Sequence, residues 1–216
     1  MAIETRKPPM KETVGAQYIV INKMDEDNQW TSEYEAVIEK LKTVKSVKVS
    51  EKTETLPSYG SGELYDSDSE TSSIDIEVEA LAFVDETVSK LKADEIGKGG
   101  LILSGGKRIR PYFAYGKVVL LRGGKFRFDW YPKCKLTENS DDSQTKEDKS
   151  TEQTDTLKIT AYPFNAKGDI VAKVSSDVNC PEGLTEEKFF SKVILTDEDL
   201  AAVVAPVQQA SASSTK

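Results

Sequence analysis

The segment from Lys107 to Lys135 constrains the fold more strongly than any other part of the chain. Two runs rich in aromatic and β-branched residues, Tyr112–Leu121 and Phe126–Tyr131, flank the tetrapeptide Arg122-Gly123-Gly124-Lys125. Glycine reaches positive φ without a Cβ clash, so a Gly-Gly pair between two apolar runs is a hairpin signal. The sequence therefore predicts an antiparallel hairpin at the centre of a β-rich domain.

The second arm of this hairpin alternates strictly between two kinds of side chain. Side chains in a strand point alternately to opposite faces, so the alternation defines two faces. One face carries Phe126, Phe128 and Trp130, and the other carries Lys125, Arg127, Asp129 and Tyr131. Three large aromatics on one face require a partner layer. The first arm is continuously apolar over Val118–Leu121, which indicates burial on both faces.

Further strands and two short helices are predicted around the hairpin. The predicted strands are Gln17–Asn22, Val44–Ser50, Ser73–Glu79, Leu157–Phe164 and Asp169–Ser176. The predicted helices are Val84–Leu91, with Gly97 beyond its end, and Thr185–Lys192, with Thr185 as its cap. The segment Ser32–Lys42 has good helix formers at helical spacing, yet it suits a strand if its neighbours are strands, and both readings stay open.

The polar stretches of the chain divide it into a body and appendages. Residues 1–15 are expected to form an extended arm, residues 16–200 the β domain, and residues 201–216 a flexible tail. Residues 51–73 and 137–156 have few apolar groups and are expected to be long loops. The predicted fold class is mainly β: an antiparallel sandwich or barrel-like domain with a flanking helix, long loops and extended termini.

Charge is distributed unevenly along the chain. The net charge is −8, but residues 107–135 carry nine Lys or Arg against one Asp, so the rest of the chain sums to −16. The acidic balance argues against general nucleic-acid binding, which needs a basic surface. A basic band on an acidic body instead suits association between copies of the same chain.

No motif for catalysis or for a bound cofactor or metal emerges from the sequence. Histidine, the commonest general base, is absent from the chain. The glycine-rich run Gly100–Arg108 departs from a phosphate loop, because Gly106 displaces the lysine by one place and Arg108 stands where Ser or Thr is needed. The alternate acids Asp66, Asp68 and Glu70 could suit calcium, but a solvated loop is favoured. We expect no enzyme, no cofactor and no metal.

Two features bear on the cellular compartment. The two cysteines, Cys134 and Cys180, could pair, although reduced thiols are favoured because the N-terminus lacks the apolar core of a signal peptide. No window approaches the roughly 20 apolar residues that a membrane helix requires. A protein made in the cytoplasm, without membrane association, is expected.

A family resemblance rests on the hairpin and on a strand pattern C-terminal to it. The run Pro111–Leu136, then a polar insert, then Thr156–Phe164 (TLKITAYPF) resembles the major tail protein of long, non-contractile-tailed bacteriophages and related prophages. The resemblance is best over Ser73–Ser176, and residues 1–70 match in organisation more than in sequence. The acidic insert at 137–156 and the helical character of Ser32–Lys42 depart from the family's pattern.

The resemblance implies a structural role. Members of this family form a β-sandwich flanked by a helix, and six copies form a ring whose sheets join into an inner barrel. The rings stack into a tube that conducts DNA during ejection. The implied partners are further copies of the chain, other tail proteins at the tube ends, and DNA that passes without specific binding; the implied location is the virion tail. The alternative is a monomeric β-sandwich binding module that recognises a host surface. The host, the ring number and the presence of a contractile sheath stay open.

Two sets of acidic residues are candidate functional positions in such a tube. The wall of a DNA conduit should repel phosphate, and Asp75, Glu77 and Glu79 are predicted to face the lumen while Ile74, Ile76 and Val78 face the core. The second set, predicted to approach Lys or Arg of the next ring, is Glu63, Asp66, Asp68 and Glu70. The alternative is that Asp75, Glu77 and Glu79 lie on an ordinary outer surface.

Overall fold

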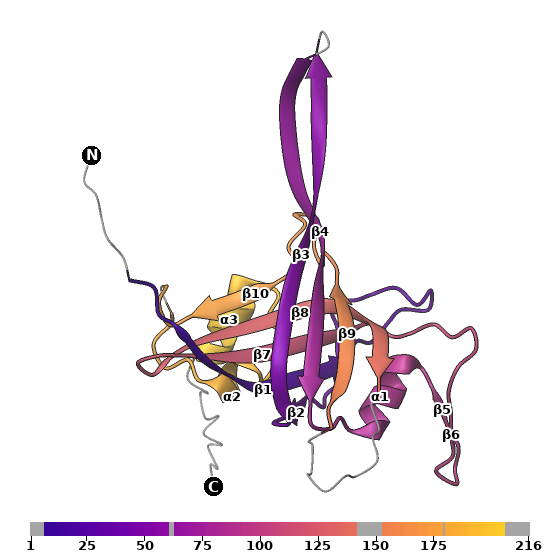
Figure 1. The fold of residues 1–216 in the computed structure, drawn as a ribbon. Helices are drawn as coiled ribbons and strands as arrows, with labels where there is room; N and C mark the ends of the chain where they lie inside the picture. Colours follow the sequence, from indigo (N-terminus) through magenta and orange to yellow (C-terminus); the bar gives the residue numbers. More distant parts are fainter. Residues whose placement is uncertain (1–6, 61–62, 142–152, 179, 206–216) are drawn as a thin grey trace, which may run out of the picture.

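One antiparallel sheet forms most of the protein (Figure 1). The computed structural model describes residues 7–60, 63–141, 153–178 and 180–205, without the side chains of 56–68. The sheet order is β2-β1-β7-β8-β9-β4-β3, with β10 paired to β8. Its strands are β1 (Lys11–Ile21), β2 (Glu39–Leu41), β3 (Val44–Gly60), β4 (Glu63–Ala80), β7 (Phe113–Leu121), β8 (Lys125–Ser140), β9 (Asp155–Ala161) and β10 (Ala172–Ser175). A separate two-stranded ribbon, β5 (Glu95–Ile96) with β6 (Ile102–Leu103), and the helices α1 (Asp85–Lys92), α2 (Glu186–Phe189) and α3 (Asp197–Val204) complete the fold.

Strand β8 belongs to both layers of the molecule. Its first half, residues 125–131, pairs with β7, and residues 127–130 pair with β10 on the other side. Its second half, residues 134–140, pairs with β9. In Figure 1 the layer β9-β4-β3 crosses in front of the layer β1-β7-β8. The sheet thus folds onto itself like a sandwich, but its described path ends at β2 and β3, so it is not closed into a barrel.

Two apolar clusters lie on opposite faces of the β1-β7-β8 layer. The first lies between the two layers and includes Ile76, Val78, Tyr115, Tyr131 and Ile159. The second includes Trp130, Phe128 and Val20 and is covered by Phe189 and Phe190, at the end of α2. We refer to them as the inner core and the helix-side core. Burial on both faces explains why the central hairpin is rich in aromatics, as the sequence predicts.

The predicted hairpin at 107–135 is confirmed. Leu121 pairs with Lys125, and Gly123 and Gly124 in the turn have φ of 82° and 72°, the region that favours glycine. Phe128 and Trp130 pack in the helix-side core, whereas Tyr131 points to the inner core. The alternation in β4 is confirmed as well, since Ile74, Ile76 and Val78 are buried.

The predicted loop over residues 51–73 is wrong. Residues 51–60 and 63–73 extend β3 and β4, and the two strands pair with each other from Val44↔Ala80 to Gly60↔Glu63. Residues 51–55, 69 and 70, at the base of this ribbon, are all polar and exposed. The absence of an apolar pattern was therefore a sign of exposure and not of irregular backbone.

The second predicted loop, residues 137–156, is partly strand. Residues 137–140 belong to β8 and residues 155–156 to β9, where Ser140 pairs with Thr156. Residues 142–152 lie outside the described part of the chain.

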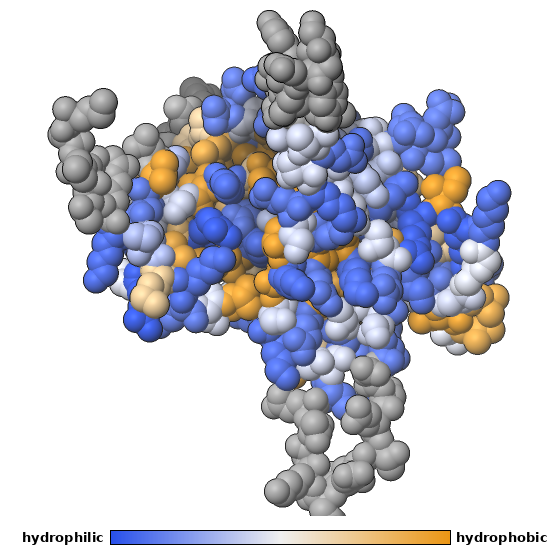
Figure 2. Space-filling view, turned by 45° about the horizontal axis from the view of Figure 1, so that its top comes forward, coloured by the Kyte–Doolittle hydropathy of each residue, from blue (hydrophilic) through white to orange (hydrophobic). Residues whose placement is uncertain are grey.

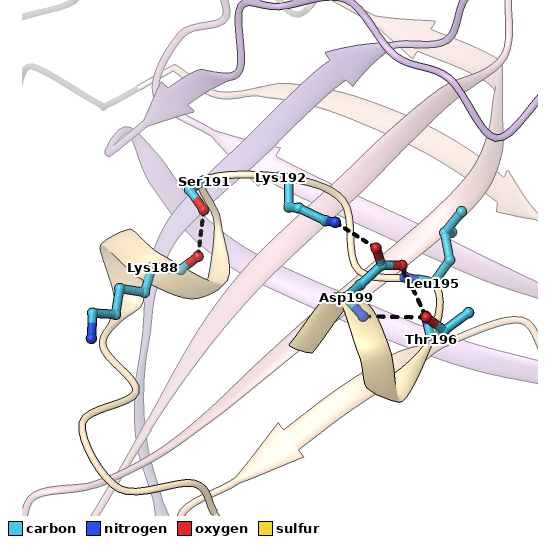
Figure 3. Close-up of polar contacts among 6 residues, drawn as sticks. All are labelled: Lys188, Ser191, Lys192, Leu195, Thr196 and Asp199. Carbon is cyan, nitrogen blue, oxygen red and sulfur yellow. Dashed lines mark hydrogen bonds and ion pairs between the residues drawn. The ribbon is translucent and has the colours of Figure 1, made fainter. Parts of the chain in front are cut away.

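The helices follow the predictions with three differences. Helix α1, at Asp85–Lys92, matches the predicted Val84–Leu91 within one residue at each end, but the left-handed residue that caps it is Ala93, with φ of 59°, and not a glycine. Thr185 caps α2 as predicted, accepting a hydrogen bond from the backbone N–H of Lys188, but α2 is only four residues long. Helix α3 was not predicted. It begins with a capping box in which Thr196 and Asp199 hydrogen-bond each other's backbone N–H (Figure 3).

Three segment assignments from the sequence are resolved by the pairing. Ser32–Lys42 contains no helix, and only its residues 39–41 form a strand, β2. The N-terminal arm predicted for 1–15 is shorter, because residues 11–15 already belong to β1. The predicted tail at 201–216 begins as helix, since α3 extends to Val204; residues 206–216 lie outside the description.

Candidate assembly surfaces

The distal halves of β3 and β4 project far beyond the rest of the sheet (Figure 1). Strand β9 pairs with β4 only from Ile74 to Ala80, so the described residues among 51–73 pair with no third strand: Glu51 pairs with Ile74, and the others belong to the β3–β4 ribbon alone. We refer to residues 51–73 as the arm. A two-stranded ribbon without a covered face is only marginally stable in water. The arm is therefore suited to being held by contact with a partner.

The side chains at the base of the arm are polar. Residues 51–55 are exposed, and so are Ser69 and Glu70. The register places Glu54 directly opposite Glu70. Two like charges at opposed positions of a strand pair destabilise the pairing. Cations from another molecule would relieve this repulsion, which makes the base of the arm a candidate contact surface.

The predicted inter-ring residues all belong to β4. Glu70 is exposed and faces Glu54 across the arm. The backbone positions of Glu63, Asp66 and Asp68 are those of a paired strand, but their side chains lie outside the described part of the structure. No contact of these three carboxylates is therefore assigned.

The acidic row Asp75, Glu77 and Glu79 lies on the outer face of β4, opposite the inner core. This face is not purely acidic. Lys52 of β3 lies 2.7 Å from Asp75, and Lys48 and Lys158 flank Glu77 in the registers of β3 and β9. The row is therefore embedded in a mixed-charge surface, a feature that the sequence of β4 alone does not contain.

Hydrogen bonds fix two of the three carboxylates. Asp75 accepts from the Thr160 hydroxyl at 3.0 Å, and Glu79 accepts from Ser46 at 2.9 Å and Thr154 at 3.0 Å. The hydrogen bond from Lys52 and that from Thr160 lower the pKa of Asp75 against the opposing effect of burial. The hydrogen bond from Ser46 lowers the pKa of Glu79 in the same way. Both carboxylates are thus held in the charged form.

The basic residues of the 107–135 hairpin mostly contact other parts of the same molecule. Arg110 donates to the backbone carbonyls of Leu136 and Thr137, Lys125 pairs with Asp177, and Lys135 lies 4.1 Å from the centre of the Tyr112 ring. The excess positive charge in this part of the sequence does not form one open basic band. The predicted attraction between such a band and the acidic arm of a neighbour is correspondingly weaker than the charge count suggests.

One exposed apolar surface was missed in the sequence. Strands β5 and β6 form a short ribbon that carries Ile96, Leu101, Ile102 and Leu103, all exposed. In Figure 2 apolar side chains gather at the right of the molecule, the side on which β5 and β6 lie in Figure 1. The signal was present as the apolar triplet Leu101–Leu103 between glycines, although the run as a whole has the composition of a glycine-rich turn.

The described residues contain no group of three or more Asp, Glu or Cys side chains placed to hold a metal ion. Both cysteines are free thiols. Cys134 is fully buried, which raises the pKa of its thiol, and its Sγ lies 3.3 Å from the carbonyl oxygen of Tyr131. The question of a Cys134–Cys180 disulfide is thereby answered in favour of reduced thiols.

Two further findings complete the description. Among the helices of the described residues, none has the length and apolar character needed to cross a membrane. No protein-family model matches this chain, and no curated protein matches it.

Proposed function

We propose that this chain is a structural subunit of a phage tail tube, in which hexameric rings of the protein stack into a conduit for DNA. The observation that carries this proposal is the arm: a long paired ribbon that projects from a well-packed sandwich and pairs with no third described strand. A monomer gains little from such a ribbon. A subunit that must reach the next ring needs one.

The edge of the sheet supports the same role. Strand β3 ends the described sheet path, so its outer backbone N–H and C=O groups lack a sheet partner there. An open edge of this kind is a template for pairing with another chain. Joining it to a neighbour in a ring closes the edge, as the family resemblance implies for the inner barrel. The inner surface of that barrel is then the outer face of β3, β4 and β9.

The mixed-charge surface on this face suits a DNA conduit. Lys48, Lys52 and Lys158 would attract phosphate if they stood alone. Each lies beside a carboxylate, as in the Lys52–Asp75 pair and the Lys158–Glu138 pair, both at 2.7 Å. The acidic row therefore offsets the neighbouring lysines, and DNA would meet a wall without net positive charge. In this role Asp75, Glu77 and Glu79 face the lumen.

The first test is the assembly state of the purified protein. Negative-stain microscopy at increasing concentration is expected to show rings and tubes. A variant with a shortened arm tests the cause: Thr55 and Ser69 are paired, so residues 56–68 can be replaced by an Asn-Gly turn without changing the register. This variant is expected to stay folded by circular dichroism and to form no long tubes.

The control keeps the length of the arm and removes only its opposed charges, through Glu54→Gln with Glu70→Gln. Because this change removes one candidate ionic contact but keeps the ribbon, tubes are expected to form in this control, at a somewhat higher protein concentration than the wild type needs. A wild-type protein that stays monomeric at every concentration contradicts the proposal and favours a monomeric binding module. Normal tubes from the short-arm variant would assign stacking to another segment.

The lumen assignment has its own test in assembled particles. Asp75→Lys, Glu77→Lys and Glu79→Lys together turn the balanced face basic, and particles are expected to assemble but to stall in DNA delivery. The charge-neutral triple variant with Asn and Gln is the matched control, and its delivery defect is expected to be smaller. Unchanged delivery with three lysines would place this face on the outside of the tube.

A further inference from the structure

The ribbon β5–β6 projects from the molecule as an apolar finger, defined here as residues 95–103. Its exposed side chains are Ile96, Leu101, Ile102 and Leu103, and Leu101 is 65% exposed. Ile109, just beyond the finger, is also exposed. Single exposed apolar residues are ordinary, but a contiguous group marks a surface for contact with another protein.

The base of the finger is fixed by a buried carboxylate. Asp94 is 3% exposed in its side chain and accepts a 2.6 Å hydrogen bond from Ser104, at the end of β6. Arg108 donates to the carbonyl of Leu103 at 2.7 Å and to that of Ala93 at 3.0 Å. At the tip, the Gly97 N–H donates to the Leu101 carbonyl at 2.8 Å. The apolar side chains are therefore presented on a pre-organised ribbon, which lowers the entropic cost of docking.

A groove of matching character lies on the other side of the sheet. It has a volume of about 300 Å³ and lies between residues 32–38 and the connection from α2 to α3. Its apolar walls are Ile38, Val193 and Leu195, and Val37 beside it is 76% exposed. Figure 3 shows the connection, with Lys192 paired to Asp199 and Leu195 next to them.

The charges around the finger and the groove are complementary. Residues 95–110 contain four basic residues and one acidic residue, Glu95, whereas residues 25–39 contain six acidic residues and no basic one. Among the acidic residues, Glu35 lines the groove itself and Glu33 is exposed nearby. Opposite potentials on two surfaces favour their encounter and fix their orientation.

We propose that the finger of one copy docks in this groove of a second copy, with Leu101 and Leu103 against Ile38 and Val193. The finger follows α1, whose Leu91 packs in the inner core, while the groove lies over Val20 and Val193 of the helix-side core. The two surfaces thus adjoin different cores and share no residue. A contact between two different surfaces is heterologous and propagates head to tail, so it can close a ring. The inference rests on the proposed function in assigning this contact to neighbours within a ring.

The experiment uses two full-length variants that each disable one surface. Leu101→Ser with Leu103→Ser removes the apolar finger, and Glu35→Lys with Val37→Arg places positive charge at the groove. Both pairs are at exposed positions apart from the fold's cores. Val178→Arg, at another exposed apolar position, is the matched control. Association is measured by sedimentation velocity over a concentration series.

The wild type and the Val178→Arg control are expected to form species larger than dimers. Each surface variant alone is expected to associate at least about tenfold more weakly, since truncating an interface anchor typically costs that much affinity. An equimolar mixture of the two variants retains one intact finger and one intact groove. It is therefore expected to form dimers and nothing larger.

Two results would overturn the finger contact: wild-type association by the Leu101→Ser/Leu103→Ser variant, or a mixture that stays monomeric while the wild type associates. A wild type that stops at dimers would overturn the head-to-tail arrangement. These outcomes are separate from the test of the tube. If the Leu101→Ser/Leu103→Ser variant lost head-to-tail association, the finger contact would be supported even if the protein formed no tube. If that variant still formed tubes, the finger contact would be refuted while the proposed tube function would stand.

Discussion

Replacing Asp129 by Asn removes the counter-charge of a lysine buried between the two layers. Lys117 is 5% exposed, and its Nζ lies 3.4 Å from an Asp129 carboxylate oxygen. Arg127 Nε lies 3.1 Å from the other oxygen but lacks hydrogen-bond geometry. Burial lowers the pKa of Lys117, against the opposing effect of the Asp129 charge. The carboxylate is therefore what keeps this amine charged inside the protein.

The distance sets the size of the effect. At 3.4 Å and an effective dielectric constant of about 20, the gross attraction is about 5 kcal/mol. Desolvation offsets part of it in the intact pair, but removing one partner of a buried pair typically costs about 3–5 kcal/mol. Asp129→Asn is expected to lower the free energy of unfolding by that amount. Lys117→Met leaves Asp129 with Arg127 and is expected to cost about 1–2 kcal/mol.

Urea unfolding followed by tryptophan fluorescence measures these changes. The double variant Lys117→Met/Asp129→Asn is expected to be more stable than Asp129→Asn alone, because no buried charge is left unpaired. In Asp129→Asn the pKa of Lys117 is depressed in the folded state relative to the ordinary value of 10.5. The unfolded state then binds more protons than the folded state, so the free energy of unfolding of the Asp129→Asn variant is expected to increase as the pH rises towards 10.5. Strictly additive effects, or a loss below about 1 kcal/mol for Asp129→Asn, would refute the reasoning.

Three further changes are predicted from local geometry. Gly116→Ala is expected to destabilise the fold by about 1–3 kcal/mol in a thermal melt, because a Cβ there would lie 2.7 Å from the Phe190 ring. Gly99→Ala is the control: a Cβ at Gly99 meets nothing within 4 Å, so no change in stability is expected. Ala93→Gly is expected to change the free energy of unfolding by less than about 1 kcal/mol, because glycine adopts the positive φ of 59° without strain but gives the unfolded chain more conformational entropy. A much larger decrease in the free energy of unfolding in urea would contradict this. Burial and the hydrogen bond to Glu186 raise the pKa of Tyr18 to about 12, so the folded state keeps this proton to a higher pH than the unfolded state does. The free energy of unfolding is therefore expected to fall as the pH rises from about 10 to 12, and Tyr18→Phe is expected to remove this pH dependence.

Part of the fold could be predicted from the sequence because it depends on residues that are close together in the chain. Gly123 and Gly124 supply the positive φ that a turn needs, and the flanking runs alternate with the period of a strand. In β4 the alternation of Ile74, Ile76 and Val78 with acids reports one buried face. Such patterns predict the element and its inward face wherever only one face packs on a core.

The candidate surfaces depended on partners far away in the sequence. The described side chains at the base of the arm are polar and exposed, and only the register with β4 makes a strand of residues 51–60. The acidic row of β4 was predicted, but its neutralising neighbours Lys52 and Lys158 come from strands on either side. Charge balance on a sheet face is a property of strand order, which a linear charge count does not contain.

The sequence by itself determined that the chain is mainly β, that residues 107–135 form its central hairpin, and that β4 presents Asp75, Glu77 and Glu79 outward. Tertiary structure alone decided that β8 runs through both layers, that Lys117 is buried with Asp129, and that the apolar run Leu101–Leu103 is exposed. The physical reason is that local patterns report backbone conformation and the presence of a buried face. Which surfaces become covered depends on how whole layers pack, and this packing leaves Leu101 exposed and buries Lys117.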